Sequence, residues 1–288
     1  MYRRIMLAVD PGGRALHALP IVVALARQAA GEVHVVTVAG RHGRELPPST
    51  TSRLQTLIRE IAAAGVAVDA EVVGPERSVA TGLAGAARRH GADLVALGSY
   101  GRSTLGAVLR GSVGMRLAAM IDTPLLMVHD QRAPENGIRL GPIRRVLVAV
   151  DRYVESEAAA DAARGLAAAH DAAVLVVHVP EVVEVLTPPG PAPRMFGYLE
   201  DDEAGEAVLE GARRRLAGLE TPISTRLLQG NGTVAARIAD TAARWGADVL
   251  VVGSRRLTPI GGLLAGSVTR ELVRRSDRPV LLAGRGPA

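Results

Sequence analysis

The chain has 288 residues, 48% hydrophobic and 22% charged, which is enough for two domains of ordinary size with apolar cores. It has no cysteine and, because all 34 basic residues are arginine, no lysine, so disulfides, thiolate metal sites, Schiff-base enzymes and lysine-dependent phosphate loops are excluded. The net charge of +5 comes from residues 1–140, which hold 16 Arg and 11 acidic residues, whereas residues 141–288 hold 18 of each and are neutral. The aromatic residues are one Trp, one Phe and four Tyr, which argues against binding of nucleic acid by base stacking.

Short apolar runs alternate with longer helical patterns along the whole chain. The runs are rich in β-branched and aliphatic residues and are bounded by Gly or Asp, which predicts strands that are buried on both faces. They span residues 5–9, 33–38, 66–73, 94–97, 125–128, 146–150, 174–179, 223–228, 249–252 and 280–283. This alternation predicts an α/β fold with parallel strands, right-handed crossovers and helices on both faces of the sheet.

The helical segments between the runs show their expected ends. Ser78 and Thr233 are expected to be N-caps of the segments 76–90 and 231–245, because their hydroxyls can accept a hydrogen bond from a free N–H group. The glycines expected just past the ends of these two helices are Gly91 and Gly246. Pro20 lies inside the first helical pattern, so we expect that helix to be kinked or to begin late.

The chain is an internal repeat. Residues 5–10 (IMLAVD) return as 146–151 (VLVAVD), and 91–99 (GADLVALGS) return as 246–254 (GADVLVVGS). The offset is 141 residues at the first strand and 155 later, so the second copy has about 14 additional residues, which we place in the Pro-rich segment 187–193. The repeat predicts two domains, 1–132 and 143–288, joined by a segment rich in Pro, Gly and charge.

Candidate ligand-binding residues follow the predicted strands. Ligands of open parallel sheets bind beyond the carboxyl ends of the strands, where the strand order reverses. Asp10 follows the first strand, and the fourth is followed by Gly98-Ser99-Tyr100-Gly101 and then by Gly111-Ser112-Val113-Gly114. Glycines let backbone approach a phosphate, and the N–H groups of a helix that begins here favour anions. Ordinary turns and helix caps use the same residues, so spacing alone leaves both interpretations open.

Strand-end Asp10, the pattern Gly98-x2-Gly101-x9-Gly111-Ser112 and the closing Thr123-Pro124-Leu125-Leu126 together resemble the universal stress protein family. The G-2x-G-9x-G-[S/T] pattern is the ATP-binding signature of that family, and the resemblance covers nearly the whole chain as two tandem domains. It implies that each domain is a Rossmann-like five-stranded parallel sheet of order 3-2-1-4-5 that holds ATP between strands 1 and 4. It also implies that the final strands pair, giving an internal pseudo-dimer, and it leaves a homodimer of chains open.

The resemblance also implies which residues contact the nucleotide. Asp10 and the backbone at Val38 would hold adenine or ribose, with Ala8 lining the floor. The residues implied around the ribose and phosphates are Gly98, Gly101, Arg102, Ser103, Gly111, Ser112 and Val113. The corresponding candidates in the second copy are Asp151, Val179, Gly253, Arg256, Gly266, Ser267 and Val268. Arg256 stands at the position of Gly101, where its side chain either blocks the phosphate or adds a charge-assisted contact to it, so we expect impaired or altered binding there.

The function implied is that of a stress-response or signalling module that binds ATP, with or without magnesium, and hydrolyses it slowly at most. One alternative is a family member that works through protein contacts without nucleotide; a flavodoxin-like redox domain is disfavoured by the scarcity of aromatic residues. The seven His residues include no i,i+4 pair and no His-Glu-x-x-His motif, so no metal ligand is predicted. His34 and His178 are interpreted as core or strand-end residues, and Trp245 is expected to pack on the sheet.

The sequence shows neither a stretch of about 18 uncharged apolar residues, which would span a membrane, nor a secretory pattern at Met1–Arg4. We therefore expect a cytoplasmic protein whose partner is an adenine nucleotide, rather than a nucleic acid or a membrane.

Overall fold

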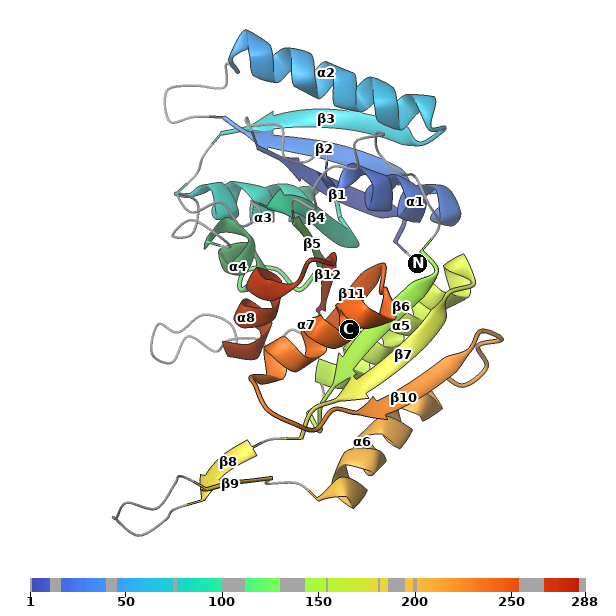
Figure 1. Cartoon of the computed structure of the whole chain (residues 1–288). Helices are drawn as coiled ribbons and strands as arrows, with labels where there is room; N and C mark the ends of the chain where they lie inside the picture. The colour runs from blue at the N-terminus through green and yellow to red at the C-terminus, as the bar shows by residue number, and fades with distance from the viewer. Residues whose placement is uncertain are drawn as a thin grey trace.

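A single ten-stranded sheet dominates the computed structural model (Figure 1). The structure describes residues 2–10, 17–39, 46–74, 77–99, 112–129, 143–153, 155–180, 182–185, 195–198, 201–253 and 267–284. The strands of the first copy are β1 (Arg4–Val9), β2 (Glu32–Val38), β3 (Ala67–Val73), β4 (Leu94–Ser99) and β5 (Leu125–His129). Those of the second copy are β6 (Arg145–Val150), β7 (Ala173–His178), β10 (Ile223–Leu227), β11 (Val249–Gly253) and β12 (Val280–Ala283). Each of the ten predicted strands is confirmed.

The strand order confirms the predicted topology of both copies. The sheet runs β10-β7-β6-β11-β12-β5-β4-β1-β2-β3, so each half has the order 3-2-1-4-5 and all of its neighbouring strands are parallel. The halves are joined by an antiparallel pair, in which Leu126 of β5 lies opposite Leu281 of β12. The expected pairing of the final strands is therefore confirmed, and it makes one sheet of the two copies.

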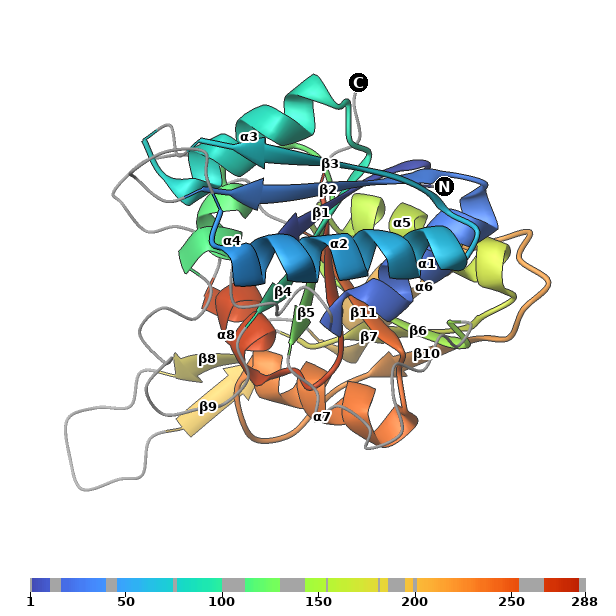
Figure 2. The ribbon, with the colours of Figure 1, turned by 90° about the horizontal axis from the view of Figure 1, so that it is seen from above.

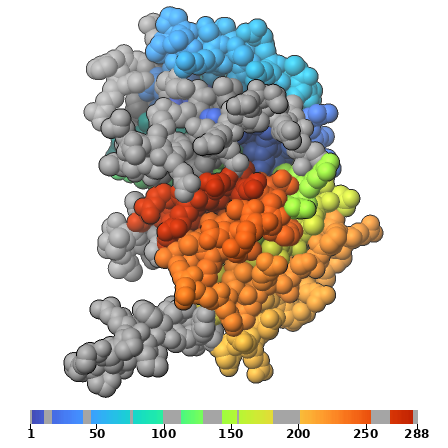
Figure 3. Space-filling view, viewed as in Figure 1, coloured from blue at the N-terminus to red at the C-terminus, as the bar shows by residue number. Residues whose placement is uncertain are grey.

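Helices cover both faces of this sheet (Figures 1 and 2). One face packs against α1 (Leu19–Ala29), α2 (Pro48–Ala63), α5 (Glu155–His170) and α6 (Asp202–Arg215). The other packs against α3 (Val79–Arg89), α4 (Ser112–Ala118), α7 (Val234–Trp245) and α8 (Ser267–Arg275). The apolar core on each face includes strand residues of both copies, for example Ile5 with Val146 on one face and Met6 with Leu147 on the other. In the space-filling view, α7 and α8 form one continuous orange and red surface beside the first copy (Figure 3).

The additional residues of the second copy form a separate hairpin. Strands β8 (Val182–Val185) and β9 (Met195–Tyr198) pair antiparallel on either side of the Pro-rich segment. The hairpin projects from the end of the molecule that includes β10 and α6 (Figure 1). Its place in the chain confirms the predicted insertion. Within the described residues, no helix is both long and apolar enough to cross a membrane.

The helix ends follow the predicted chemistry. The Ser78 hydroxyl accepts a hydrogen bond from the Thr81 N–H group, and the Thr233 hydroxyl accepts one from the Ala236 N–H group. Helix α1 begins only at Leu19, which places Pro20 in its first turn, where a missing N–H group breaks no helical hydrogen bond. This helix therefore begins late rather than bending. The glycines after α3 and α7, Gly91 and Gly246, both have positive φ, of 54° and 71°.

The prediction that all strands are buried on both faces is wrong for β3 and β10. Within β3 only Val73 is buried, and β10 has no buried residue. Both strands lie at the edges of the sheet, where each has a single neighbour and incomplete cover by helices. A polar face is tolerated at such an edge, and it leaves Asp69 and Glu71 of β3 able to reach neighbouring side chains.

We expect Gly31→Ala to lower the free energy of unfolding by about 1–3 kcal/mol, because overpacking against backbone has no cheap relief. A Cβ atom on Gly31, between α1 and β2, would lie 2.5 Å from the Arg3 carbonyl oxygen and 2.8 Å from the Arg3 Cα. Gly165→Ala in α5 is the control, because its Cβ would meet nothing within 4 Å; there we expect a gain of about 0.5–1 kcal/mol. Urea unfolding of both variants measures the difference, and equal effects would contradict the steric argument.

Candidate functional site

The order of strands reverses at β1 in the first copy. β1 pairs with β2 on one side and with β4 on the other, so Ala8 lies opposite Val36 of β2 and Leu97 of β4. Asp10 directly follows β1, and Gly98 is the residue after Leu97 on β4. The fold therefore places Asp10 and Gly98 at neighbouring strand ends, on the carboxyl edge of the sheet.

Small apolar residues line the surface at these carboxyl strand ends. Ala8 and Val38 are each 8% exposed, and Asp10 beside them is half-buried. Helix α4 begins at Ser112 and lies close to β4 and β5: a Cβ on its Gly114 would lie 2.9 Å from the Met127 Sδ. Val113, in the first turn of α4, is exposed. The structure thus brings the Asp10 carboxylate, Gly98 near the end of β4 and the start of α4 to the same end of the first copy.

Several predicted contacts lie outside the described residues. These are Gly101, Arg102, Ser103, Gly111, Arg256 and Gly266. Their part in a binding site stays a prediction that rests on the sequence pattern.

In the second copy, the corresponding aspartate, Asp151, forms hydrogen bonds with nearby residues of the same chain. The Asp151 Oδ1 accepts hydrogen bonds from the Tyr153 N–H group at 2.9 Å and from the Ser156 hydroxyl at 2.7 Å. The Asp151 N–H group in turn donates to the Ser156 Oγ at 2.7 Å. This reciprocal pair resembles a capping arrangement ahead of α5, and it occupies the carboxylate that the sequence pattern assigns to a ligand.

The neighbouring strand end of the second copy is also filled by a side chain. His178, at the end of β7, is buried, and its Nδ1 lies 2.8 Å from the Val150 carbonyl oxygen at the end of β6, where it donates a hydrogen bond. The equivalent residue of the first copy is Thr37, opposite Val9 as His178 is opposite Val150. His178 is thus the strand-end residue that was predicted. The other second-copy candidates are placed as in the first copy: Val179 is buried, Gly253 ends β11, Ser267 begins α8 and Val268 is exposed.

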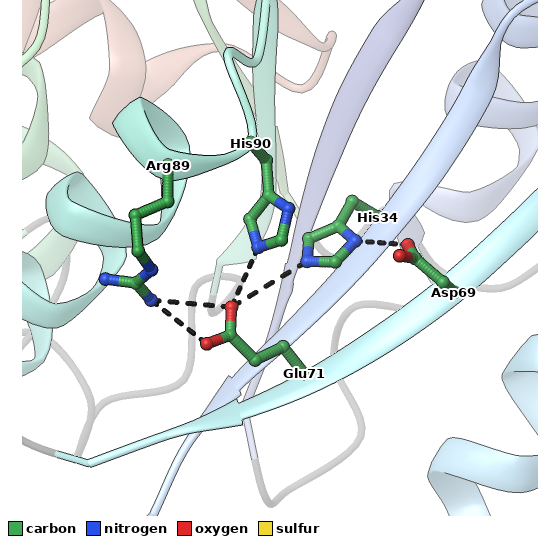
Figure 4. A network of polar contacts seen from close by, with 5 residues as sticks. All are labelled: His34, Asp69, Glu71, Arg89 and His90. Carbon is green, nitrogen blue, oxygen red and sulfur yellow. Dashed lines mark hydrogen bonds and ion pairs between the residues drawn. The ribbon is translucent and has the colours of Figure 1, made fainter.

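A second group of polar residues lies at the amino-terminal ends of the first copy's strands, where the sequence predicted no functional site and His34 only as a core or strand-end residue (Figure 4). His34 of β2 and His90, which follows α3, both approach Glu71 of β3, and the rings of the two histidines are 3.2 Å apart between centroids. The hydrogen bond that His90 Nε2 donates to Glu71 is the largest cause of a lowered Glu71 pKa, and Arg89 adds to it against an opposing effect of burial. Three separate elements supply these residues, so a local motif search could not find them.

The internal repeat, the 3-2-1-4-5 strand order of each copy and a match to a family model together assign the chain to a family. The model of the universal stress protein family matches residues 1–129 and 142–284. The chain belongs to the universal stress protein family. Both copies are covered by the match, in agreement with the resemblance drawn from Asp10 and the glycine pattern.

Known universal stress proteins agree with this assignment. One from Mycolicibacterium smegmatis is 29% identical over 221 residues, which are 76% of this chain and 69% of that protein. One from Mycobacterium tuberculosis is 30% identical over 197 residues, 67% of this chain and 62% of that protein. A crystal structure of a universal stress protein from Archaeoglobus fulgidus covers 98% of this chain and 96% of its own, with a TM-score of 0.70 and 18% identity. At that identity the structural likeness supports the tandem fold.

We expect Ser156→Ala to lower the free energy of unfolding by about 1–2 kcal/mol, because it removes both hydrogen bonds between Ser156 and Asp151 and leaves a half-buried N–H group without its acceptor. Ser52→Ala on the exposed side of α2 is the control and should change stability by less than about 0.5 kcal/mol. Chemical denaturation measures both. If the two variants are equally stable, the Asp151–Ser156 pair does not hold the second copy's strand end.

Proposed function

We propose that this universal stress protein binds ATP at the carboxyl ends of β1 and β4 in its first copy and acts as a stress-response or signalling module. The observation that supports the proposal best is the reversal of strand order at β1, with Asp10 and Gly98 at adjacent strand ends. Crevices at such reversals are the usual ligand sites of open α/β sheets.

The described residues fit an adenosine group. Ala8 and Val38 offer a nearly buried, small apolar floor, which suits the flat face of a base. The half-buried Asp10 carboxylate can accept hydrogen bonds from an adenine amino group or from ribose hydroxyls. A carboxylate beside a ribose selects for the free hydroxyls, because a phosphate in their place would be repelled.

The phosphates must be held without lysine. Backbone N–H groups of the glycine-rich segment after β4, the hydroxyl of Ser112 and the guanidinium of Arg102 are the groups that the sequence pattern supplies for this task. The phosphoryl oxygens of ATP can accept hydrogen bonds from all of these groups. The set therefore favours ATP, alone or with magnesium, as the ligand.

The second copy is proposed to bind ATP weakly or not at all. Its Asp151 carboxylate is engaged by Ser156 and by the Tyr153 N–H group. Its phosphate loop has Arg256 where the first copy has Gly101. A ligand would have to displace hydrogen bonds at one end and accommodate a long side chain at the other.

We expect Asp10→Ala to weaken ATP binding about tenfold, as the loss of a charge-assisted hydrogen bond would do. Asp151→Ala is the matched control in the second copy and should change the affinity by less than about twofold. Isothermal titration calorimetry with ATP measures both variants. An equal loss in the two variants, or a loss confined to Asp151→Ala, would contradict the assignment of the site to the first copy.

We also expect about one ATP per chain at saturation, and a weaker complex for Gly101→Ala, since a Cβ there obstructs the approach of phosphate to backbone. Calorimetric stoichiometry and affinity test this. A stoichiometry near two would refute the difference between the copies, and full affinity in Gly101→Ala would place the phosphates elsewhere.

If millimolar ATP with magnesium fails to raise the unfolding temperature, the alternative of action through protein contacts without nucleotide is favoured instead.

A further inference from the structure

The polar group at the amino-terminal edge of the first copy's strands has the composition of a metal site. His34, Glu71 and His90 come from β2, β3 and the end of α3, and their three nearest ligand atoms all lie within 4.8 Å of one another (Figure 4). Two imidazoles and one carboxylate are the donor set that divalent ions of the zinc class prefer.

The distances between these atoms suit a small ion. Glu71 Oε2 lies 2.8 Å from His90 Nε2 and 3.8 Å from His34 Nε2. In a tetrahedral site with zinc bonds of about 2.0–2.1 Å, ligand atoms are about 3.3 Å apart. The two observed separations lie on either side of that value, so small rotations of the side chains would complete the geometry.

His34 is oriented as a metal-binding imidazole. Its Nδ1 is hydrogen-bonded to Asp69 Oδ1, and because a carboxylate only accepts, Nδ1 is the protonated nitrogen. The Nε2 lone pair then faces Glu71, and among the described residues this buried nitrogen has no hydrogen-bond partner. A carboxylate that fixes the far nitrogen of a histidine is the usual outer contact of a zinc ligand.

The surrounding charges accommodate a cation. Arg89 contacts Glu71 chiefly through Oε1, at 3.1 Å, which leaves Oε2 as the atom nearest both histidines. The C-terminal end of α3, immediately before His90, adds the negative end of a helix dipole. The adjoining pocket is lined by Arg4, Glu32, Asp69 and the two histidines, so acidic groups face it from β2 and β3 and one arginine faces it from β1.

The second copy shows that the fold does not need these residues. In the equivalent positions it has Leu175, opposite Leu147 as His34 is opposite Met6, and Arg226, opposite Val177 as Glu71 is opposite Val36. Trp245 ends α7 where His90 follows α3, and Arg145 packs over its ring at 5.8 Å while donating to its carbonyl oxygen at 2.8 Å. Apolar packing and one cation–π contact thus fill the place that the first copy gives to two histidines and a glutamate.

We propose that His34 Nε2, Glu71 Oε2 and His90 Nε2 bind one divalent transition-metal ion, with Zn²⁺ as the best fit, and that a fourth position is open to solvent. His90 coordinates as a neutral imidazole, so the Nε2 proton that it shares with Glu71 moves to Nδ1 or leaves on binding. The site lies at the edge of the sheet opposite Asp10 and Gly98, so it does not depend on the proposed nucleotide function.

Titration of the untagged full chain with ZnCl₂ in the absence of nucleotide tests the proposal. We expect one tight Zn²⁺ per chain, and at least tenfold weaker binding in His34→Gln and in His90→Gln. His170→Gln is the matched control, because among the described residues the His170 Nε2 is also buried without a hydrogen-bond partner, yet His170 does not belong to the group formed by His34, Glu71 and His90. Unchanged binding in the two cluster variants, or no binding by the wild-type chain, overturns the proposal.

A second measurement begins with the wild-type protein, so it does not depend on whether the two glutamine variants fold. Co²⁺ added to the wild-type protein should give the intense visible absorption of a four-coordinate ion with histidine ligands, and Zn²⁺ should abolish it by competition. The variant His34→Leu, which introduces the residue that the second copy has at this position, should fold and show no such spectrum. A spectrum that persists in folded His34→Leu, or the pale spectrum of hydrated Co²⁺ in the wild-type protein, would count against the site.

Discussion

The antiparallel pair between β5 and β12 is the constraint on which the rest of the molecule depends. Each five-stranded half has β3 or β10 at its outer edge and would expose a second edge at its final strand. Pairing Leu126 with Leu281 removes both of these inner edges and continues the apolar cores of the two faces from one copy into the other. Because buried apolar area stabilises a fold in proportion to its extent, the two copies support each other as one unit.

This shared framework leaves the strand ends free to differ between the copies. At the carboxyl edge, the second copy satisfies Asp151 with Ser156 and fills its neighbouring strand end with His178. At the amino-terminal edge, it has Trp245 packed by Arg145 where the first copy gathers polar ligands around Glu71. The residues that pair and pack are similar in the two copies, whereas the residues at the strand ends differ, because side chains there contribute little to the common core.

Much of the fold could be predicted from local patterns. The ten apolar runs became the ten strands, Pro20 delayed the start of α1, and the Pro-rich segment fell within the β8–β9 hairpin. The exposure of β3 and β10 could not be predicted in this way, since a strand's position at the edge of a sheet depends on the order of all its strands. The approach of His34 to His90 was equally hidden, because they lie 56 positions apart in the sequence and only strand register and the end of α3 bring them together.

The sequence by itself determined the repeat, the alternation of strands and helices, the absence of lysine and cysteine chemistry, and the family pattern around Asp10 and Gly98. These features are local or periodic, and the periodicity of apolar residues records them directly. The tertiary structure alone decided that Asp151 is held by Ser156 and that His34, Glu71 and His90 converge beside Asp69. Such contacts join side chains from separate elements, and their geometry exists only after the strands have taken their register and the helices have packed on the sheet.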